Sequence, residues 1–301
     1  MAKKTVKKVF ITIGSILVLG FLITLGISYY VARQLTHPKR KPITKTPDAY
    51  DLEYHNIQFP SRVDSLQLKG WFIPADSSTH KIVIEAHGYR DNRSDIPAEL
   101  PVAKALNKVG LSVLLFDFRA EGESPGKIVT GGLYEVRDLL GAVDYAKSLD
   151  YDKIGVLGFS MGATTTIRAA GQDTLISAIV ADGAFNSQFF NGQLHTKTHL
   201  PTFPFTPEII WIAKTVYGID FTKIAAEKTF NNWKPRPALL IAGTADQVVP
   251  VDNTRKLYNE IKDEPNTEFW VVKRGRHIRS YNIHPDLYVR KVAGFFSKFL
   301  Y

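Results

Sequence analysis

The 301-residue chain contains no cysteine, and this absence excludes several kinds of chemistry at once. Without a thiol the protein forms no disulfide, has no thiolate nucleophile and holds no zinc–thiolate or iron–sulfur centre. A chain without cysteine is also unaffected by whether its compartment oxidises thiols. An extracytoplasmic location is therefore permitted.

Acidic residues are absent from the first 45 positions, which hold nine of the 38 Lys and Arg residues. The other 29 basic residues balance the 29 Asp and Glu residues, so the net charge of +9 describes the N-terminal segment and leaves the rest formally neutral. Binding to a phosphate backbone relies on a broad positive field. Because the body of the chain lacks such a field, we expect no nucleic-acid partner.

Charged residues are also missing from Val9 to Ala32, where the sequence reads VFITIGSILVLGFLITLGISYYVA. A helix of this length crosses a hydrocarbon core of about 30 Å, and Tyr29 and Tyr30 stand where interfacial aromatic residues are expected. The alternatives are a cleaved signal peptide and a buried core helix. A signal peptide has a shorter apolar run and an A-x-A-like cleavage site. We predict a transmembrane signal anchor over residues 9–32, with the lipid bilayer as its partner.

On either side of this span the chain is basic. Residues 1–8 are expected to form an N-terminal tail, and residues 33–48 a proline-containing linker that serves as an extended tether. Four Lys residues precede the span and five Lys or Arg residues follow it, so the positive-inside rule does not fix the orientation. A short basic head before a long apolar run is typical of a signal anchor. We therefore expect a single-pass protein of the cell membrane, with residues 49–301 outside the cytoplasm.

After residue 48, short apolar runs rich in β-branched residues alternate with helical patterns, which predicts a mostly parallel sheet covered by helices. Strands are expected at 52–59, 66–73, 81–86, 112–117, 153–157, 176–181, 238–243 and 268–272, the first two as an antiparallel hairpin at one edge. Helices are expected at 96–109, 133–148, 161–170, 251–261 and 286–300. The long aromatic-rich connection over 183–236 predicts a helical cap; packing of its aromatic side chains onto the domain is the simpler alternative.

The segment Gly158-Phe159-Ser160-Met161-Gly162 follows the apolar run KIGVL and precedes a helical pattern. This setting is what a nucleophile elbow requires, a serine in a strained turn with flanking glycines that keep side chains out of a crowded contact. An isolated G-x-S-x-G arises by chance, whereas one between a strand and a helix is far more specific. We predict Ser160 as a nucleophile and Gly158 and Gly162 as the elbow glycines.

A serine hydroxyl needs a base within hydrogen-bond reach and an acid that holds the base in the right tautomer. Asp246 follows the run ALLIAG and His277 follows FWVV, so both are expected at the carboxyl edge of the sheet, in the chain order Ser, Asp, His that this architecture uses. We predict Asp246 as the acid and His277 as the base. Asp182 is the rival carboxylate, and His284, near the start of the last helix, is the rival histidine.

The oxyanion that forms in acyl transfer requires backbone N–H donors. We expect one donor from Met161, which follows the nucleophile at a helix N-terminus, and the other from Tyr89, in the segment His87-Gly88-Tyr89 after the run IVIEA. His87 is a further candidate for the base. A histidine before glycine at this point more often supports the loop.

Taken together, these residues resemble the α/β-hydrolase superfamily, especially bacterial membrane-anchored cell-surface hydrolases related to the serine aminopeptidase group. The resemblance covers about 66–300 and also includes Phe116-Asp117-Phe118-Arg119, Gly122-Glu123-Ser124, Thr130-Gly131, Glu135 and Asp138. The chain departs from the family at Ala120-Glu121, where Gly-His is common, and at Arg276, where a small residue often precedes the histidine. The resemblance implies that 49–301 form an α/β-hydrolase domain, with an eight-stranded, mostly parallel sheet flanked by helices and a cap at 183–236 that determines substrate choice.

We therefore expect a membrane-anchored serine hydrolase that cleaves a carboxylic ester, or a related acyl bond, of a small molecule through a Ser-His-Asp triad, with no metal and no cofactor. An ester is favoured because the cap is apolar and no carboxylate pair is arranged to bind a peptide amino terminus. A peptidase or aminopeptidase, or an acyltransferase, with the same triad remains an alternative. A non-catalytic surface binding module on the same fold is another, and the presence of all three triad residues argues against it.

Overall fold

The computed structural model describes residues 2–75, 79–190 and 199–301. The chain divides into two compact units, one of residues 1–36 and 190–221 and the other of residues 37–189 and 222–301. In chain order the elements are α1 (Ala2–Thr36), η1 (Pro47–Tyr50), β1 (His55–Pro60), β2 (Gln67–Ile73), β3 (Lys81–Ala86), α2 (Glu99–Lys108), β4 (Ser112–Phe116), α3 (Glu135–Ser148), β5 (Lys153–Phe159), α4 (Met161–Ala170), β6 (Ile176–Asp182), α6 (Thr202–Tyr217), η2 (Phe221–Lys223), η3 (Glu227–Asn232), β7 (Ala238–Gly243), α7 (Val251–Ile261), β8 (Thr267–Val272), α8 (Ser280–Ile283) and α9 (Pro285–Leu300).

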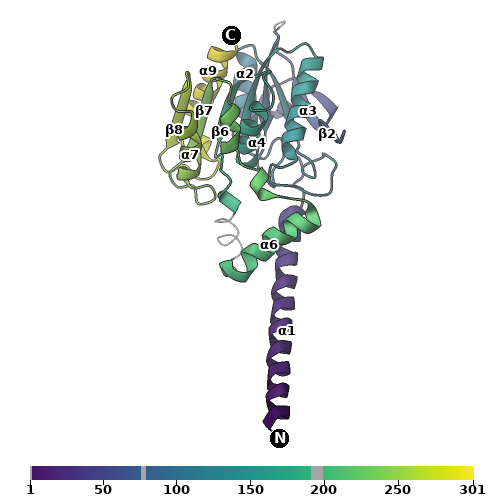
Figure 1. Cartoon of the computed structure of the whole chain (residues 1–301). Coiled ribbons are helices and arrows are strands. Elements are labelled where there is room, and N and C mark those ends of the chain that lie inside the picture. The colour runs from purple at the N-terminus through teal and green to yellow at the C-terminus, as the bar shows by residue number, and fades with distance from the viewer. Residues whose placement is uncertain (1, 76–78, 191–198) are drawn as a thin grey trace. The chain divides into compact units, whose positions relative to one another are not determined.

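The larger unit is built on an eight-stranded sheet in the order β1-β2-β4-β3-β5-β6-β7-β8. Figure 1 shows β6, β7 and β8 side by side in this sheet. β2 pairs antiparallel with both β1 and β4, and the other neighbours pair in parallel. The carboxyl ends of β5, β7 and β8 therefore meet at one edge of the sheet. Loops that follow these three strands are brought together there.

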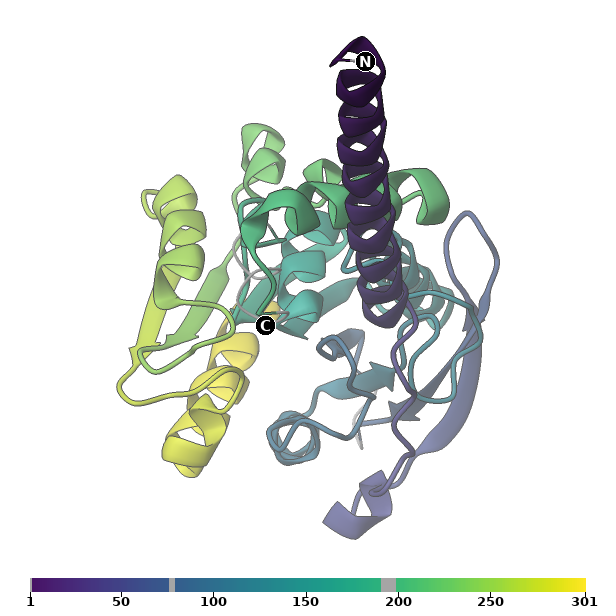
Figure 2. The ribbon, with the colours of Figure 1, turned by 90° about the horizontal axis from the view of Figure 1, so that it is seen from below.

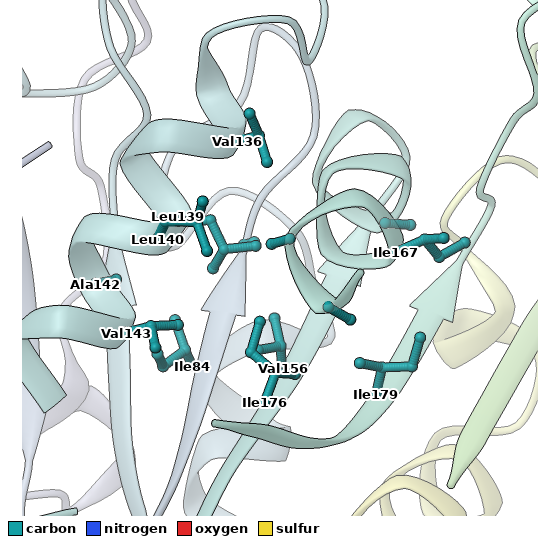
Figure 3. Close-up of a cluster of buried hydrophobic side chains, with 14 of the residues drawn as sticks. Ile84, Val136, Leu139, Leu140, Ala142, Val143, Val156, Ile167, Ile176 and Ile179 are labelled. Atoms are coloured by element: carbon teal, nitrogen blue, oxygen red, sulfur yellow. The ribbon is translucent and has the colours of Figure 1, made fainter. Parts of the chain in front are cut away.

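Both faces of the sheet are covered, because side chains alternate between the faces along each strand. On one face, Ile84 of β3 and Val156 of β5 pack against apolar side chains of α3 and α4 (Figure 3). On the other, Val83 and Leu157 pack with α2 and α9. A strand that is buried on both faces has a continuous apolar sequence. For this reason β5 and β7 could be predicted from the sequence.

The predicted fold class is confirmed, and every predicted strand and helix of the sheet region has a counterpart in the structure. Boundaries move by up to three residues. β5 continues to Phe159 and β6 to Asp182 because these two residues still pair across the sheet. α2 begins at Glu99, three residues later than expected, where the Glu99 carboxylate accepts the Ile96 amide at 2.9 Å.

The smaller unit consists of α1 and part of the predicted cap. Within α1, Lys4–Thr36 is long and apolar enough to cross a membrane by length and composition. α6 lies beside the carboxyl-terminal third of α1, and Figure 2 shows this pairing from below. Residues 191–198 of the predicted cap lie outside the described residues.

Aromatic residues of the cap divide into packed and exposed ones. Phe205 packs against the apolar cluster that α1 and α6 share, whereas Phe203 is 81% exposed and Trp211 57% exposed. The simpler interpretation, in which the cap aromatics pack onto the domain, therefore does not account for Phe203 and Trp211.

Candidate active site

Ser160 lies in the turn between β5 and α4, at φ 53° and ψ −112°, a conformation that side-chain-bearing residues rarely adopt. A Cβ atom on Gly158 would stand 2.4 Å from the Gly162 carbonyl oxygen, and one on Gly162 would stand 2.0 Å from that of Ala86. Both predicted elbow positions therefore exclude any larger residue. The strained turn holds the Ser160 hydroxyl at the carboxyl edge of the sheet.

The structure brings the three predicted triad side chains into one hydrogen-bonded chain. His277 Nε2 lies 2.7 Å from Ser160 Oγ, and His277 Nδ1 lies 2.8 Å from Asp246 Oδ2. The other carboxylate oxygen, Asp246 Oδ1, accepts the amides of Val248 and Val249, each at 2.8 Å. Because both Asp246 oxygens are engaged, the carboxylate fixes the imidazole with Nδ1 as donor and Nε2 facing the hydroxyl.

The two predicted oxyanion donors belong to segments that border Ser160. Met161 is the first residue of α4, so its amide has no acceptor within the helix. On the other side, a Cβ atom on Gly88 would lie 3.5 Å from Ser160 Cβ, so the 88–89 peptide is close to Ser160. The Tyr89 side chain is largely buried, and burial raises the pKa of its phenol.

Among the described residues, neither His87 nor His284 forms a hydrogen bond with the Ser160 hydroxyl. His87 is buried, its Nε2 accepts the Phe118 amide at 3.0 Å, and its Nδ1 donates to the Gly88 carbonyl at 2.7 Å. It therefore supports the loop after β3. His284 is exposed and precedes α9, where its carbonyl accepts the Tyr288 amide.

The rival carboxylate Asp182 is buried and accepts a 2.8 Å hydrogen bond from the Tyr288 hydroxyl. Burial raises its pKa from 3.8 to about 7. Because the folded chain keeps this proton up to a higher pH than the unfolded chain, the free energy of unfolding falls as pH rises from about 4 to about 7.

We expect Asp182→Asn to remove this pH dependence, since an amide accepts the Tyr288 hydroxyl without ionising. Relative to the unsubstituted protein, the variant should gain about 2 to 3 kcal/mol of unfolding free energy between pH 5 and pH 8. Urea unfolding at both pH values measures the gain. Asp252→Asn, at a carboxylate that is 78% exposed, is the matched control; an equal gain in both variants would contradict the assignment.

Several motif residues outside the triad hold the loops around it. Arg119 forms hydrogen bonds with the Asp138 carboxylate at 2.6 and 2.9 Å, and the Glu135 carboxylate accepts the amides of Thr130 and Gly132. These buried pairs fix the segment between β4 and α3. They are structural and do not reach Ser160.

A cavity of about 710 Å³ adjoins the triad and is lined by Asp91, Ala245, Gln247, Val248, Arg276, His277, Ile278 and Arg279. Sequence reasoning pointed to Arg276 only as a departure from the family and did not find Asp91 or Arg279. In the sequence, the signal for residues that line such a cavity is a charged side chain in a loop that follows a strand. Nothing in the sequence shows which of these side chains share the cavity.

Of the predicted linker 33–48, residues 33–36 belong to α1 and residues 47–48 to η1, and residues 37–46 between them form no helix or strand. Arg40 Nη2 donates to the Gly126 carbonyl at 3.1 Å, and Lys41 Nζ lies 2.7 Å from Asp91 Oδ1. The Asn92 side-chain amide donates to the carbonyls of Lys41 and Pro42. The part of the linker around Lys41 is therefore bound next to the cavity.

A sheet of this order, with a strained serine after β5 and a histidine after β8, defines an α/β-hydrolase. The prolyl oligopeptidase family matches residues 130–300, and the chain belongs to that family. The match covers the elbow, the Asp246 loop and the His277 loop. Membership of the α/β-hydrolase superfamily, expected from the motifs, is thereby confirmed.

Relatives of known sequence or structure cover most of the chain. The protein YfhR of Escherichia coli O157:H7 is 26% identical over 83% of this chain and 82% of its own length, and YqkD of Bacillus subtilis is 28% identical over 76% and 74%. Among solved structures, the Pyrococcus furiosus esterase Pf2001 is 29% identical with a TM-score of 0.72, over 89% of this chain and 99% of the esterase.

Proposed function

We propose that the protein is a membrane-anchored serine hydrolase that cleaves a carboxylic ester through an acyl-enzyme. Ser160 attacks the ester carbonyl while His277 takes the hydroxyl proton, and the amides of Tyr89 and Met161 donate to the oxyanion. The tetrahedral intermediate collapses, the ester C–O bond breaks, and His277 passes its proton to the leaving alcohol. A water molecule then attacks the acyl-enzyme by the same route, which releases the acid and restores Ser160.

One observation carries this proposal: the unbroken chain of hydrogen bonds from Asp246 through His277 to Ser160, with lengths of 2.8 and 2.7 Å. A binding module has no need for a serine in a strained turn with a base at its hydroxyl. The similarity to the esterase Pf2001 over most of both chains adds support for ester cleavage.

Amide cleavage by the same triad is the second candidate, because the chain belongs to the prolyl oligopeptidase family. An amide leaving group needs the His277 proton more than an ester does, so the two reactions share every residue and differ in rate. Parallel assays with nitrophenyl esters and aminoacyl anilides separate them.

Membrane anchoring is supported by the length and apolar character of α1, whose side chains from Val6 to Ile23 are largely exposed. We propose a cytoplasmic N-terminus and an external hydrolase domain.

A fluorophosphonate probe, applied to the full-length protein, tests the catalytic proposal: modification of Ser160 is expected, and a folded protein that resists the probe would contradict it.

A further inference from the structure

The cavity beside the triad carries more positive than negative charge. Arg276 and Arg279 flank His277 in sequence and line the cavity with it, and the carboxylate among its lining residues is Asp91. Within the described ranges of the chain, neither guanidinium forms an ion pair shorter than 4 Å. Arg279 donates one N–H to the Ile278 carbonyl at 3.2 Å, which leaves its other N–H groups for a ligand.

The negative charge of Asp91 is compensated from outside the cavity. Lys41 Nζ lies 2.7 Å from its Oδ1 and also contacts Asp95. Burial raises the pKa of Asp91 to about 6, so this carboxylate is either paired with Lys41 or protonated. In both cases it contributes little negative field, and the two guanidinium groups dominate the cavity.

We propose that this cavity binds a carboxylate or phosphate group of the substrate, so that the preferred ester carries a negative charge on its acyl chain or on its alcohol. Guanidinium groups bind both kinds of anion through paired N–H···O bonds. The proposal rests on the function proposed above, because it names the class of ester that the same triad cleaves.

Matched pairs of esters test the preference on the full-length protein in nonionic micelles. The para-nitrophenyl monoester of adipic acid is compared with para-nitrophenyl hexanoate, which has the same chain length, and butyrylglycerol phosphate is compared with monobutyrin. We expect kcat/KM to be about tenfold higher for the charged member of one pair, and that pair identifies which side of the ester carries the anion. The advantage should shrink as ionic strength rises, because the charges are partly exposed.

Reversing the charge of a residue that lines the cavity tests whether the preference for charged esters arises there. Arg276→Glu should lower the ratio of charged to neutral kcat/KM by about tenfold or more. Arg274→Glu is the matched control: the residue is exposed in the same loop but does not line the cavity, so the ratio should stay the same. Equal rates for both members of each pair, or an equal loss in the two variants, would overturn the anion site. Failure of the proposed function looks different, since neither ester would be cleaved and Ser160 would not be labelled.

A second inference concerns α6 and rests on separate contacts. The Glu208 carboxylate lies between two hydroxyl groups of α1, 2.9 Å from Thr24 Oγ1 and 2.7 Å from Ser28 Oγ. Thr24 and Ser28 are one helical turn apart, and Ala32, one turn further on, is buried against Ile209 and Ile212 of α6. This face of α1 therefore packs against α6 through two hydrogen bonds and an apolar contact.

The exposed surface of α6 combines large apolar side chains with the charged Lys214, which pairs with Asp220. Phe203, Trp211 and Val216 are more than half exposed, and the helix that carries them packs against the apolar α1. The uncharged run of 24 residues is about 36 Å long as a helix, longer than the hydrocarbon core, so its end near Ser28 lies at the edge of that core. Tryptophan at this depth is typical of the lipid–water interface.

We infer that α6 lies in the headgroup region of the bilayer, fixed at that depth by Glu208. The partner of its exposed apolar side chains is lipid, because α6 packs against the end of the helix that would span the bilayer. Since α6 belongs to the insertion between β6 and β7, the insertion as well as the N-terminus would then be held at the membrane.

Tryptophan quenching by lipids brominated near the headgroup end of the chains tests this inference on the full-length protein in vesicles. Trp211→Phe should remove most of the quenching, whereas Trp270→Phe, at a partly buried position in β8, should retain it. Glu208→Leu should weaken the quenching, and Glu208→Gln, which keeps two hydrogen-bonding atoms, should preserve most of it. Quenching that survives Trp211→Phe, or a protein that alkaline carbonate washes off the vesicles, would overturn the inference.

Discussion

Replacing Ser160 with alanine is expected to lower kcat for a para-nitrophenyl ester by about 10⁶-fold and to abolish labelling by a fluorophosphonate. The variant keeps the oxyanion donors and the cavity, so a residual rate above that of water should remain. Folding should be preserved, because His277 is the hydrogen-bond partner of the hydroxyl among the described residues and the turn depends on the backbone and on the glycines on either side. Initial rates and intact-protein mass after labelling provide the measurements.

Ser177→Ala is a suitable control for this experiment. Ser177 lies at the amino end of β6, opposite the carboxyl edge of the sheet where Ser160 lies, and its hydroxyl donates to the Leu175 carbonyl. Its kcat and its labelling should match those of the unsubstituted protein. Labelling that persists in Ser160→Ala, at another serine, would show that the reactive hydroxyl was assigned to the wrong residue.

The elbow could be predicted from the sequence because its signals are local. A β-branched run, a G-x-S-x-G turn and a helical pattern all fall between Lys153 and Ala170. The steric constraint at Gly158 also arises within this segment, whereas the one at Gly162 comes from Ala86 of the neighbouring strand β3. Parallel-sheet topology then made the loops after β7 and β8 neighbours of that turn. This is why Asp246 and His277 were found without any contact information.

Contacts between distant segments were not predictable in the same way. Lys41 meets Asp91 across 50 residues, and Glu208 meets Ser28 across 180. Lys41 lies in a basic linker and Glu208 in an apolar helix, and no sequence pattern around either residue predicts its partner. Tertiary packing alone decided that the linker is bound beside the cavity and that α6 packs on α1.

Burial was another property that periodicity could not supply. Glu85 lies on β3 between apolar neighbours, and both of its carboxylate oxygens are buried with no hydrogen-bond partner in the described part of the chain. Burial raises its pKa well above the ordinary value, because the charged form is the costlier one to bury. In the sequence the residue breaks an otherwise apolar run, which gave no indication that the strand buries it fully.

Asp246→Asn is expected to lower kcat by about 10⁴-fold while leaving the fold intact. The asparagine oxygen would accept the amides of Val248 and Val249 as the carboxylate oxygen does, which turns the side-chain NH₂ group toward His277. Two donors would then face each other, so the imidazole would shift its proton to Nε2 and could no longer accept the Ser160 proton. Pre-steady-state acylation with a nitrophenyl ester measures this loss directly.

Asp182→Asn provides the comparison, because it makes the same chemical change in the rival carboxylate of the same active-site region. Asp182 accepts from Tyr288 and is not bonded to the imidazole, so its effect on kcat should be small beside that of Asp246→Asn. The two variants also differ in stability: only the change at Asp182 removes a carboxyl whose pKa burial raises to about 7. The opposite outcome is a large loss of acylation rate in Asp182→Asn together with nearly full activity in Asp246→Asn. It would reverse the assignment of the acid. It would also require His277 to rotate toward β6 during catalysis.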